Sequence, residues 1–287
     1  MAINAHGGGI LHFNEIKSGE TYLPEANQEW GGTRVNLTGI SCYSSQDLLN
    51  WKFRGNVLHS VEDNSEHDLY WENVAERPKV IFNAMTGMFV MWLHIDSMDY
   101  SKARVGVASS SSPIGPFDYL SSFRPNNQMA RDLTVFVDDD DEATAYLLTS
   151  SEDNAVMHIS QLSDDYLAVR TDLPFHRVFI GRYMEAPTLF KSQGFYYFIG
   201  SGCTAWEPNA ARSAVAKSID GPWRELGNPA IGPDSNNTFS SQSTFVLPMD
   251  GSNRQGRFIF MADRWVKDDL ASSRYVWLHL SSTKIAQ

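Results

Sequence analysis

The sequence is poor in cysteine and has no long apolar run. Only Cys42 and Cys203 occur, far apart and without the spacing of a metal site. Two free, buried thiols are therefore favoured over a disulfide. No uncharged apolar run reaches the roughly 18 residues that a membrane-spanning helix needs. These absences predict a soluble, globular protein that does not bind membranes.

Basic residues are outnumbered by acidic ones, 23 against 34, which gives a formal net charge of −11. Such a field repels phosphate backbones, so nucleic acid is not expected as a partner, whereas a neutral substrate is compatible with it. The N-terminus lacks a charged segment followed by an apolar one, so no signal peptide is expected in this sequence. Sequons at Asn36 and Asn236 favour a secretory compartment only slightly.

Motifs of several common chemistries are also missing. The triple glycine 7–9 lacks the lysine and the strand-to-helix context of a phosphate-binding loop. The acidic run 138–141 lacks the spacing and terminal glutamate of a calcium-binding hand. The histidines form no HExxH pair, and there is no GxSxG elbow. We therefore expect neither a cofactor nor a metal.

What the sequence does contain is a repeated aromatic strand, within a composition that is 42% hydrophobic and 12% aromatic. Copies lie at residues 88–92, 145–148, 195–198 and 257–260. With Phe89, Tyr146, Tyr197 and Ile259 as markers, the steps between copies are 57, 51 and 62 residues. A period of this length is typical of the four-stranded blades of a β-propeller.

A second repeated element, a small-residue strand and a turn ending in an aromatic residue, supports the same interpretation. It ends at Phe117 and Trp223, with weaker copies ending at Trp51 and Tyr166. Few stretches show helical periodicity. Four such units and a last segment to Leu280 predict an all-β, five-bladed β-propeller that forms a single domain over residues 1–287. A β-sandwich is the alternative, but the repeat is long for one hairpin pair.

Polar residues stand just ahead of four predicted inner strands. These residues are Glu76, Asp132, Glu185 and Gln242. Because a propeller brings its inner strands around one axis, we expect the four side chains to meet at one mouth. Pro187 pushes the backbone near Glu185 towards extended geometry, at a strand edge. Each residue alone has an ordinary explanation, such as an ion pair with a neighbouring arginine, but the repeated position favours a shared site.

Carboxylates that converge on a cleft are what glycoside hydrolysis requires. One protonated acid donates its proton to the leaving oxygen, and a second group activates water or attacks the anomeric carbon. Asp132 beside Glu185 would raise the pKa of Glu185 and keep it protonated near neutral pH. Exposed aromatic side chains would stack on sugar faces, and Trp71, Tyr100 and Trp206 are candidates, although such residues more often belong to the core.

Short motifs occur in a fixed order along nearly the whole chain. They lie at residues 4–10, 76–80, 94–96, 106–108, 131–136, 151–154, 185–187, 201–204 and 260–265. Together they resemble glycoside hydrolase family 43, and in particular its exo-β-1,3-galactanase branch. The resemblance implies a five-bladed propeller that releases galactose, with inversion, from the non-reducing end of β-1,3-galactan, as in arabinogalactan backbones. Such a substrate suggests a secretory or extracellular setting, and we expect a monomer.

The resemblance also implies roles for individual residues. Glu185 matches the general acid, and Asp132 matches the acid that tunes and orients it. Glu76 would recognise the axial hydroxyl that distinguishes galactose, and Gln242 matches a glutamine that replaces the usual aspartate base. An amide is a poor proton acceptor, so Gln242 either holds the attacking water or acts in an imidic-acid form. Further sugar contacts are implied for Tyr100, Asn154 and Thr204.

The chain departs from the family pattern near its start. Family members usually have a Tyr-Tyr-Trp-Tyr-Gly-Glu strand soon after the glycine-rich motif, whereas here Glu20 runs almost directly into Thr21 and Tyr22. We therefore expect a shortened or missing inner strand in the first blade, with Glu20 as the stand-in for that strand's substrate-binding glutamate. A carbohydrate-binding domain, found on some relatives, is not expected.

Two alternatives remain at this stage. The first is a carbohydrate-binding propeller of the same fold that has lost turnover through the change in the first blade. The second is a family 43 arabinofuranosidase or xylosidase. Glu76 argues against this second alternative, because it matches the residue that distinguishes galactose.

Overall fold

The computed structural model of the protein describes residues 6–13, 21–31, 34–249, 257–266 and 273–281. Within these ranges the secondary structure is almost entirely strand, with two 3-10 turns, η1 (Pro125–Asn127) and η2 (Ser235–Asn237). No helix among these residues is long and apolar enough to cross a membrane. The predominance of strands confirms the all-β class that the aromatic, glycine-punctuated repeats predict.

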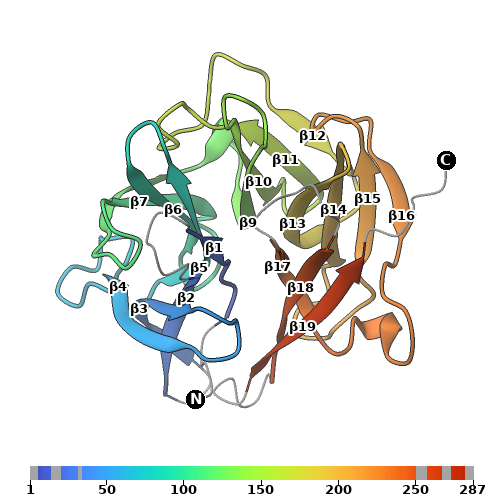
Figure 1. Cartoon of the computed structure of the whole chain (residues 1–287). Coiled ribbons are helices and arrows are strands. Elements are labelled where there is room, and N and C mark those ends of the chain that lie inside the picture. Colours follow the sequence, from blue (N-terminus) through green and yellow to red (C-terminus); the bar gives the residue numbers. More distant parts are fainter. Residues whose placement is uncertain (1–5, 14–20, 32–33, 250–256, 267–272, 282–287) are drawn as a thin grey trace.

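The described strands form four sheets of four strands and one sheet of three, arranged around a common centre (Figure 1). The first blade contains β1 (Leu11–His12), β2 (Thr21–Gly31), β3 (Arg34–Ser45) and β4 (Lys52–His59). The second contains β5 (Val74–Asn83), β6 (Met88–Asp96), β7 (Arg104–Ser110) and β8 (Asp118–Phe123). The third contains β9 (Ala130–Val137), β10 (Ala145–Ser151), β11 (Val156–Gln161) and β12 (His176–Val178). The fourth contains β13 (Met184–Ser192), β14 (Phe195–Gly202), β15 (Arg212–Ala216) and β16 (Arg224–Gly227). The last sheet contains β17 (Gln242–Pro248), β18 (Arg257–Arg264) and β19 (Arg274–Ser281).

Each sheet is an antiparallel meander in which every strand pairs with the next one along the chain. The leading strands β5, β9, β13 and β17 contact one another in this order. They therefore line the centre of the molecule, and their starts bring residues far apart in sequence together. This is the β-propeller arrangement that the repeats predict.

The number of complete blades differs from the prediction. Among the described residues four sheets, not five, have four strands, and the smaller one is the last sheet rather than the first blade. In the first blade β1 is short, with two residues, but β2 is present and pairs with β3 from Thr21 to Gly31. The short β1 agrees with the expectation of a shortened strand in the first blade, whereas no described strand of this blade is missing, because main-chain pairing with β3 defines β2 without the family's aromatic pattern.

The start of the chain packs against the last sheet. The Thr244 hydroxyl donates to the Gly8 carbonyl at 3.0 Å. The indole rings of Trp51 and Trp277 meet edge to face, with centroids 5.8 Å apart. Contacts between the two ends of the chain therefore close the ring.

The core lies between neighbouring blades, and β6 illustrates why its sequence is continuously apolar. Met91 and Leu93 face the cluster shared with the first blade, whereas Val90 and Trp92 face the cluster shared with the third. Successive side chains of a strand point to opposite faces. Because both faces are covered, the strand has no polar face to mark it.

The two cysteines are both free, as expected, but only one is buried. Cys42 lies in the core, whereas Cys203 is exposed. The prediction that both thiols are buried is wrong for Cys203, because this residue follows the end of β14, where Gly202 makes the final pair with Met184. It therefore lies at the same end of β13 as Glu185.

Candidate active site

The four polar residues predicted from the repeats all stand at the start of leading strands: Glu76 on β5, Asp132 on β9, Glu185 on β13 and Gln242 on β17. A register shift interrupts the ladder next to each of them. The shifts lie between Glu76 and Lys79, opposite Asp132 between Thr149 and Ser151, between Glu185 and Thr188, and between Ser243 and Phe245. β-Bulges redirect side chains and are common beside active sites. The four predicted residues therefore share one local backbone feature.

The Glu185 carboxyl group is partly buried and hydrogen-bonded. Asn154 Nδ2 donates to Oε1 at 2.9 Å, and Gln242 Nε2 lies 3.5 Å from Oε2. Burial, and then the negative charge of Asp132, raise the pKa of Glu185 from its ordinary value of 4.5 to about 7. Glu185 can therefore hold a proton near neutral pH.

The neighbouring Asp132 is held in its ionised form. Burial opposes its ionisation, but the positive charges of Arg77 and His94 and a hydrogen bond from Ala186 N outweigh burial and lower its pKa. Arg77 Nε donates to Oδ1 at 3.2 Å, and Ala186 N donates to Oδ2 at 2.8 Å. Ala186 directly follows Glu185 in β13. Asp132 therefore raises the pKa of Glu185 and also anchors the strand that contains it.

The Gln242 side chain is fixed at both ends. Its Oε1 accepts a hydrogen bond from Arg77 Nη2 at 2.6 Å, and its Nε2 donates to Ser201 Oγ at 3.0 Å. Arg77 also donates to the Ser243 carbonyl and lies 3.5 Å from Asp263. The amide thus has one defined orientation between β5 and β14.

Glu76 belongs to a series of hydrogen-bonded polar side chains on the second blade. The Tyr100 hydroxyl donates to its Oε1 at 2.8 Å, and His94 Nδ1 lies 3.4 Å from its Oε2. Asp96 bonds the other ring nitrogen of His94 at 2.8 Å. Burial disfavours the imidazolium, but the Asp96 and Glu76 carboxylates outweigh burial and raise the pKa of His94 to about 9. Glu76 is therefore held in place by a phenol and a cation.

Glu76, His94 and Asp132 each place one potential ligand atom within 4.8 Å of the others. The raised pKa leaves His94 protonated, so its ring offers no lone pair to a metal. The Arg77 guanidinium already neutralises Asp132. We therefore interpret these three side chains as parts of hydrogen-bonded networks rather than as a metal centre.

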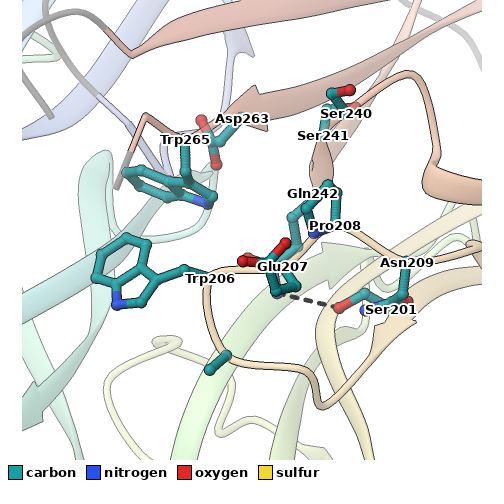
Figure 2. Close-up of a pocket in the computed structure, with 11 residues that line it drawn as sticks. Ser201, Trp206, Glu207, Pro208, Asn209, Ser240, Ser241, Gln242, Asp263 and Trp265 are labelled. Carbon is teal, nitrogen blue, oxygen red and sulfur yellow. Dashed lines mark hydrogen bonds between the residues drawn. The ribbon is translucent and has the colours of Figure 1, made fainter. Parts of the chain in front are cut away.

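A pocket opens beside Gln242, with a volume of about 400 Å³ that includes space open to solvent. Its walls come from the loop after β14 and from the ends of β17 and β18. They consist of Ser201, Ala205, Trp206, Glu207, Pro208, Asn209, Ser240, Ser241, Gln242, Asp263 and Trp265. Figure 2 shows the two indole rings together on one side, with Gln242 bonded to Ser201 opposite them. Trp206 is 46% exposed and meets Trp265 edge to face, so it offers an apolar surface to a sugar.

The remaining predicted residues differ in where they lie. Asn154 contacts Glu185 directly, whereas Thr204 accepts from Asn209 Nδ2 at 2.7 Å and so shapes the Trp206 loop. Trp71 hydrogen-bonds through its backbone to Val61 and is not among the residues that line the described pocket. Glu20 lies outside the described residues.

Sequence reasoning missed Arg77 and Asp263 as parts of the site. Arg77 is 6% exposed and Asp263 is fully buried. Asp263 accepts hydrogen bonds from Gly7 N at 3.2 Å, so it joins the two ends of the chain. The sequence feature that could have revealed this role is the position of Arg77 directly after Glu76. Sequence reasoning interpreted this arginine only as an ion-pair partner of Glu76.

Comparison with known proteins agrees with this geometry. The model of glycosyl hydrolases family 43 matches residues 15–244. A solved GH43 β-1,3-galactosidase with galactodeoxynojirimycin is 40% identical, with a TM-score of 0.88, over 96% of this chain and 90% of that one. No curated protein matches the chain.

Two further solved structures are exo-β-1,3-galactanases. The enzyme from Phanerochaete chrysosporium, with β-1,3-galactotriose, is 36% identical, with a TM-score of 0.85, over 96% of this chain and 60% of that one. The enzyme from Clostridium thermocellum is 36% identical, with a TM-score of 0.84, over 99% of this chain and 60% of that one. This protein thus spans about three fifths of both galactanases. By the family match and these similarities, it belongs to glycoside hydrolase family 43.

Proposed function

We propose that the protein is an inverting exo-β-1,3-galactanase that releases galactose from β-1,3-galactan, including arabinogalactan backbones. The observation on which this rests is the pairing of Glu185, with a pKa raised to about 7, and ionised Asp132 at the mouth of a family 43 propeller. The similar galactosidase and galactanases, at 36–40% identity, support the choice of sugar and linkage.

Glu185 would act as the general acid. At neutral pH it would donate its proton to the glycosidic oxygen as the bond to the anomeric carbon breaks. Asp132 would keep that proton in place until the substrate arrives, and Asn154 would hold the carboxyl orientation. Because Asp132 is bonded to Ala186 N, the strand that contains Glu185 cannot shift without breaking this contact.

Gln242 would hold the attacking water on the opposite face of the sugar. Inverting glycosidases keep their two catalytic groups about 6.5–9.5 Å apart to make room for that water. Here Gln242 Nε2 and Glu185 Oε2 are only 3.5 Å apart. Galactose binding would therefore have to separate the two side chains.

Glu76 would recognise the axial hydroxyl of galactose. Its carboxylate is fixed by Tyr100 and His94, so it offers an acceptor in a defined direction. Tyr100 and Thr204 would add contacts at the rim, and Trp206 a stacking surface. A sugar without the axial hydroxyl would leave the buried part of this network unpaired, which disfavours pentose substrates.

We also propose that the last sheet acts as a fifth blade and that residues 1–287 function as one catalytic domain and as a monomer in a secretory or extracellular setting. The support for the fifth blade is its packing on β13 and on the start of the chain. Size-exclusion chromatography with light scattering tests the monomer, and secretion from cells that express the native gene tests the setting.

The decisive experiment is incubation with β-1,3-galactan and a panel of aryl glycosides. We expect free galactose, first seen by NMR as the α-anomer because the reaction inverts. Glu185→Gln should lower kcat by about 100-fold or more, since it removes the proton donor. Glu225→Gln is the matched control, because Glu225 is an exposed residue of β16 that pairs with Arg182.

Other results of the same assay would contradict the proposal. Release of a pentose would indicate an arabinofuranosidase or xylosidase. Binding of galactan without product would indicate a carbohydrate-binding propeller. Galactose that first appears as the β-anomer would show retention.

A further inference from the structure

Arg77 lies where three sheets meet. It occupies the bulge of β5 with a left-handed φ of 54° and is 6% exposed. A non-glycine residue in this conformation is strained and persists only where its surroundings fix it. Its guanidinium reaches strands of the third blade and of the last sheet. The groups that it contacts are the Asp132 carboxylate, the Gln242 amide oxygen, the Ser243 carbonyl and the Asp263 carboxylate.

These contacts need the shape of an arginine. Nε and Nη2 hold the two oxygens of Asp132, at 3.2 Å each, while Nη2 also donates to Gln242 Oε1 at 2.6 Å. Nη1 points the other way, to the Ser243 carbonyl at 3.1 Å. A planar fork with five N–H groups can make these bonds at once, whereas a lysine ammonium cannot span them.

The contact with Gln242 determines which end of the amide faces which neighbour. Arginine has no acceptor, so an NH2 group turned towards Arg77 would be left without a partner. Oε1 must therefore face Arg77, and Nε2 must face Ser201 and Glu185, as observed. An N–H aimed at Oε1 stabilises its carbonyl form. An imidic acid would instead place a proton on this oxygen.

We propose that Arg77 is a positioning residue for the hydrolysis: it holds Gln242 as an amide, with Oε1 as an acceptor, and orients Asp132 beside Glu185. This inference rests on the proposed function. The second acceptor position of Oε1 is then the one left for a hydrogen of the attacking water. One guanidinium thereby links the group that positions water to the group that tunes the acid.

Several charged groups face this arrangement from the neighbouring strands. They are Glu76 and Lys79 on β5, His94 on β6, Asp132 on β9, Glu185 on β13 and Asp263 on β18. Arg77 lowers the pKa of Asp132 and also, more weakly than burial and Asp132 raise it, lowers that of Glu185. Removing Arg77 should therefore raise the pH at which Asp132 takes up a proton.

The test compares Arg77→Lys and Arg77→Ala with wild type in galactose release from β-1,3-galactobiose between pH 4 and 9. Displacement of reacting groups by about 1 Å can cost roughly 100-fold. We expect a loss of kcat of this size with a smaller change in KM in both variants. In Arg77→Ala, which also removes the positive charge, the acid limb of the pH profile should move to higher pH. Guanidinium chloride at low concentration should partly restore Arg77→Ala but not Arg77→Lys.

The matched control is Arg170→Ala, because Arg170 pairs with Asp172 in a loop away from the site. It should leave kcat and the pH profile unchanged. A purely structural role of Arg77 would lower the folded fraction and scale the rate equally at every pH. Wild-type kcat in Arg77→Lys, or an unshifted acid limb in Arg77→Ala, would overturn the proposal.

A measurement on the free enzyme does not depend on activity. In protein labelled with ¹⁵N-glutamine, Gln242 should give two protected protons on one side-chain nitrogen, identified by their loss in Gln242→Ala. Arg77→Lys should remove that protection. A single proton on this nitrogen in wild type, or equal protection in both proteins, would contradict the inference. If wild type releases no galactose, the proposed function fails, while this spectrum still tests the anchoring of Gln242.

Discussion

At the scale of single residues, the site combines an acid that resists ionisation with an acid that favours it. Glu185 and Asp132 belong to different blades. Of these two carboxyl groups, only that of Asp132 forms an ion pair with Arg77. The pKa values of the pair are thereby driven apart, which is the usual way in which two carboxyl groups acquire different roles.

Asp132→Asn tests this separation. The substitution removes the negative charge that helps to raise the pKa of Glu185, so that pKa should fall below about 7. Because Glu185 acts in its protonated form, the alkaline limb of kcat/KM should move to lower pH. The pH profile on β-1,3-galactobiose measures the shift. An alkaline limb that stays in place would show that burial alone sets the pKa.

Glu185→Gln should make the protein more stable above neutral pH. The pKa of Glu185 is raised in the folded protein, from 4.5 to about 7. The free energy of unfolding therefore falls as pH rises through this range, and the full loss is reached above about pH 7. The glutamine has no charge to bury, and we expect a gain on the order of 1–2 kcal/mol at pH 8 and almost none at pH 4. Urea unfolding at both pH values measures the difference. Equal gains at pH 4 and pH 8 would contradict the assignment.

Glu76→Ala should weaken the recognition of galactose more than the chemistry. The change removes an acceptor that Tyr100 and His94 hold in place, so KM for β-1,3-galactobiose should rise by about 10-fold or more with a smaller change in kcat. Initial rates over a range of substrate concentrations give both constants. An unchanged KM would show that another residue recognises the axial hydroxyl.

The sequence predicted the three acids and Gln242, but not Arg77, which holds both Asp132 and Gln242. Glu76, Asp132, Glu185 and Gln242 repeat at one place in four units, and repetition is visible in one dimension. The contacts of Arg77 reach residues 55 and 165 positions away, and no local pattern marks such contacts.

At the scale of elements, close packing of strands depends on a few glycines. Gly39, in β3, has a φ of 137°, and an added Cβ would lie 2.4 Å from the Leu58 carbonyl oxygen of β4. Backbone atoms cannot yield as a side chain can. The two strands can approach here only because residue 39 has no side chain.

Gly39→Ala should therefore destabilise the first blade by about 2–3 kcal/mol. Urea unfolding followed by tryptophan fluorescence measures the loss. Gly87→Asn is the matched control, because Gly87 has a φ of 69°, which asparagine tolerates, and no atoms near its added Cβ. A loss as small as that of the control would mean that β4 can move away from β3.

The blades show how far element prediction from sequence can go. The repeats predicted the leading strands and the aromatic second strands, because both faces of these strands are buried and their composition is distinctive. The strand β2 lacks that composition, and its position depends on pairing with β1 and β3. Pairing between strands is a tertiary property, so the first blade was the part least well predicted.

At the scale of the whole molecule, closure of the ring and assembly of the site use the same residue. Asp263 accepts from Gly7 N, at the start of the chain, and lies 3.5 Å from Arg77 Nη1. The carboxylate is fully buried. A change at this residue should therefore affect folding and catalysis together.

Asp263→Ala should lower the free energy of unfolding by about 3–5 kcal/mol, since it leaves a buried N–H without a partner and Arg77 with less compensation. Thermal unfolding measures the loss, and kcat should fall even at temperatures where the variant is folded. The exposed Asp172, which pairs with Arg170, provides the control Asp172→Ala. A destabilised variant with wild-type kcat would show that closure and catalysis are separable.

The exposed thiol of Cys203 has a practical consequence. Partial burial, and then the negative charge of Glu185, raise its pKa to about 12, so it stays a weakly reactive thiol in ordinary buffers. The protein's other cysteine is buried. Thiol-directed reagents at mildly alkaline pH should therefore leave Cys203 largely unmodified, although it lies at the rim of the mouth.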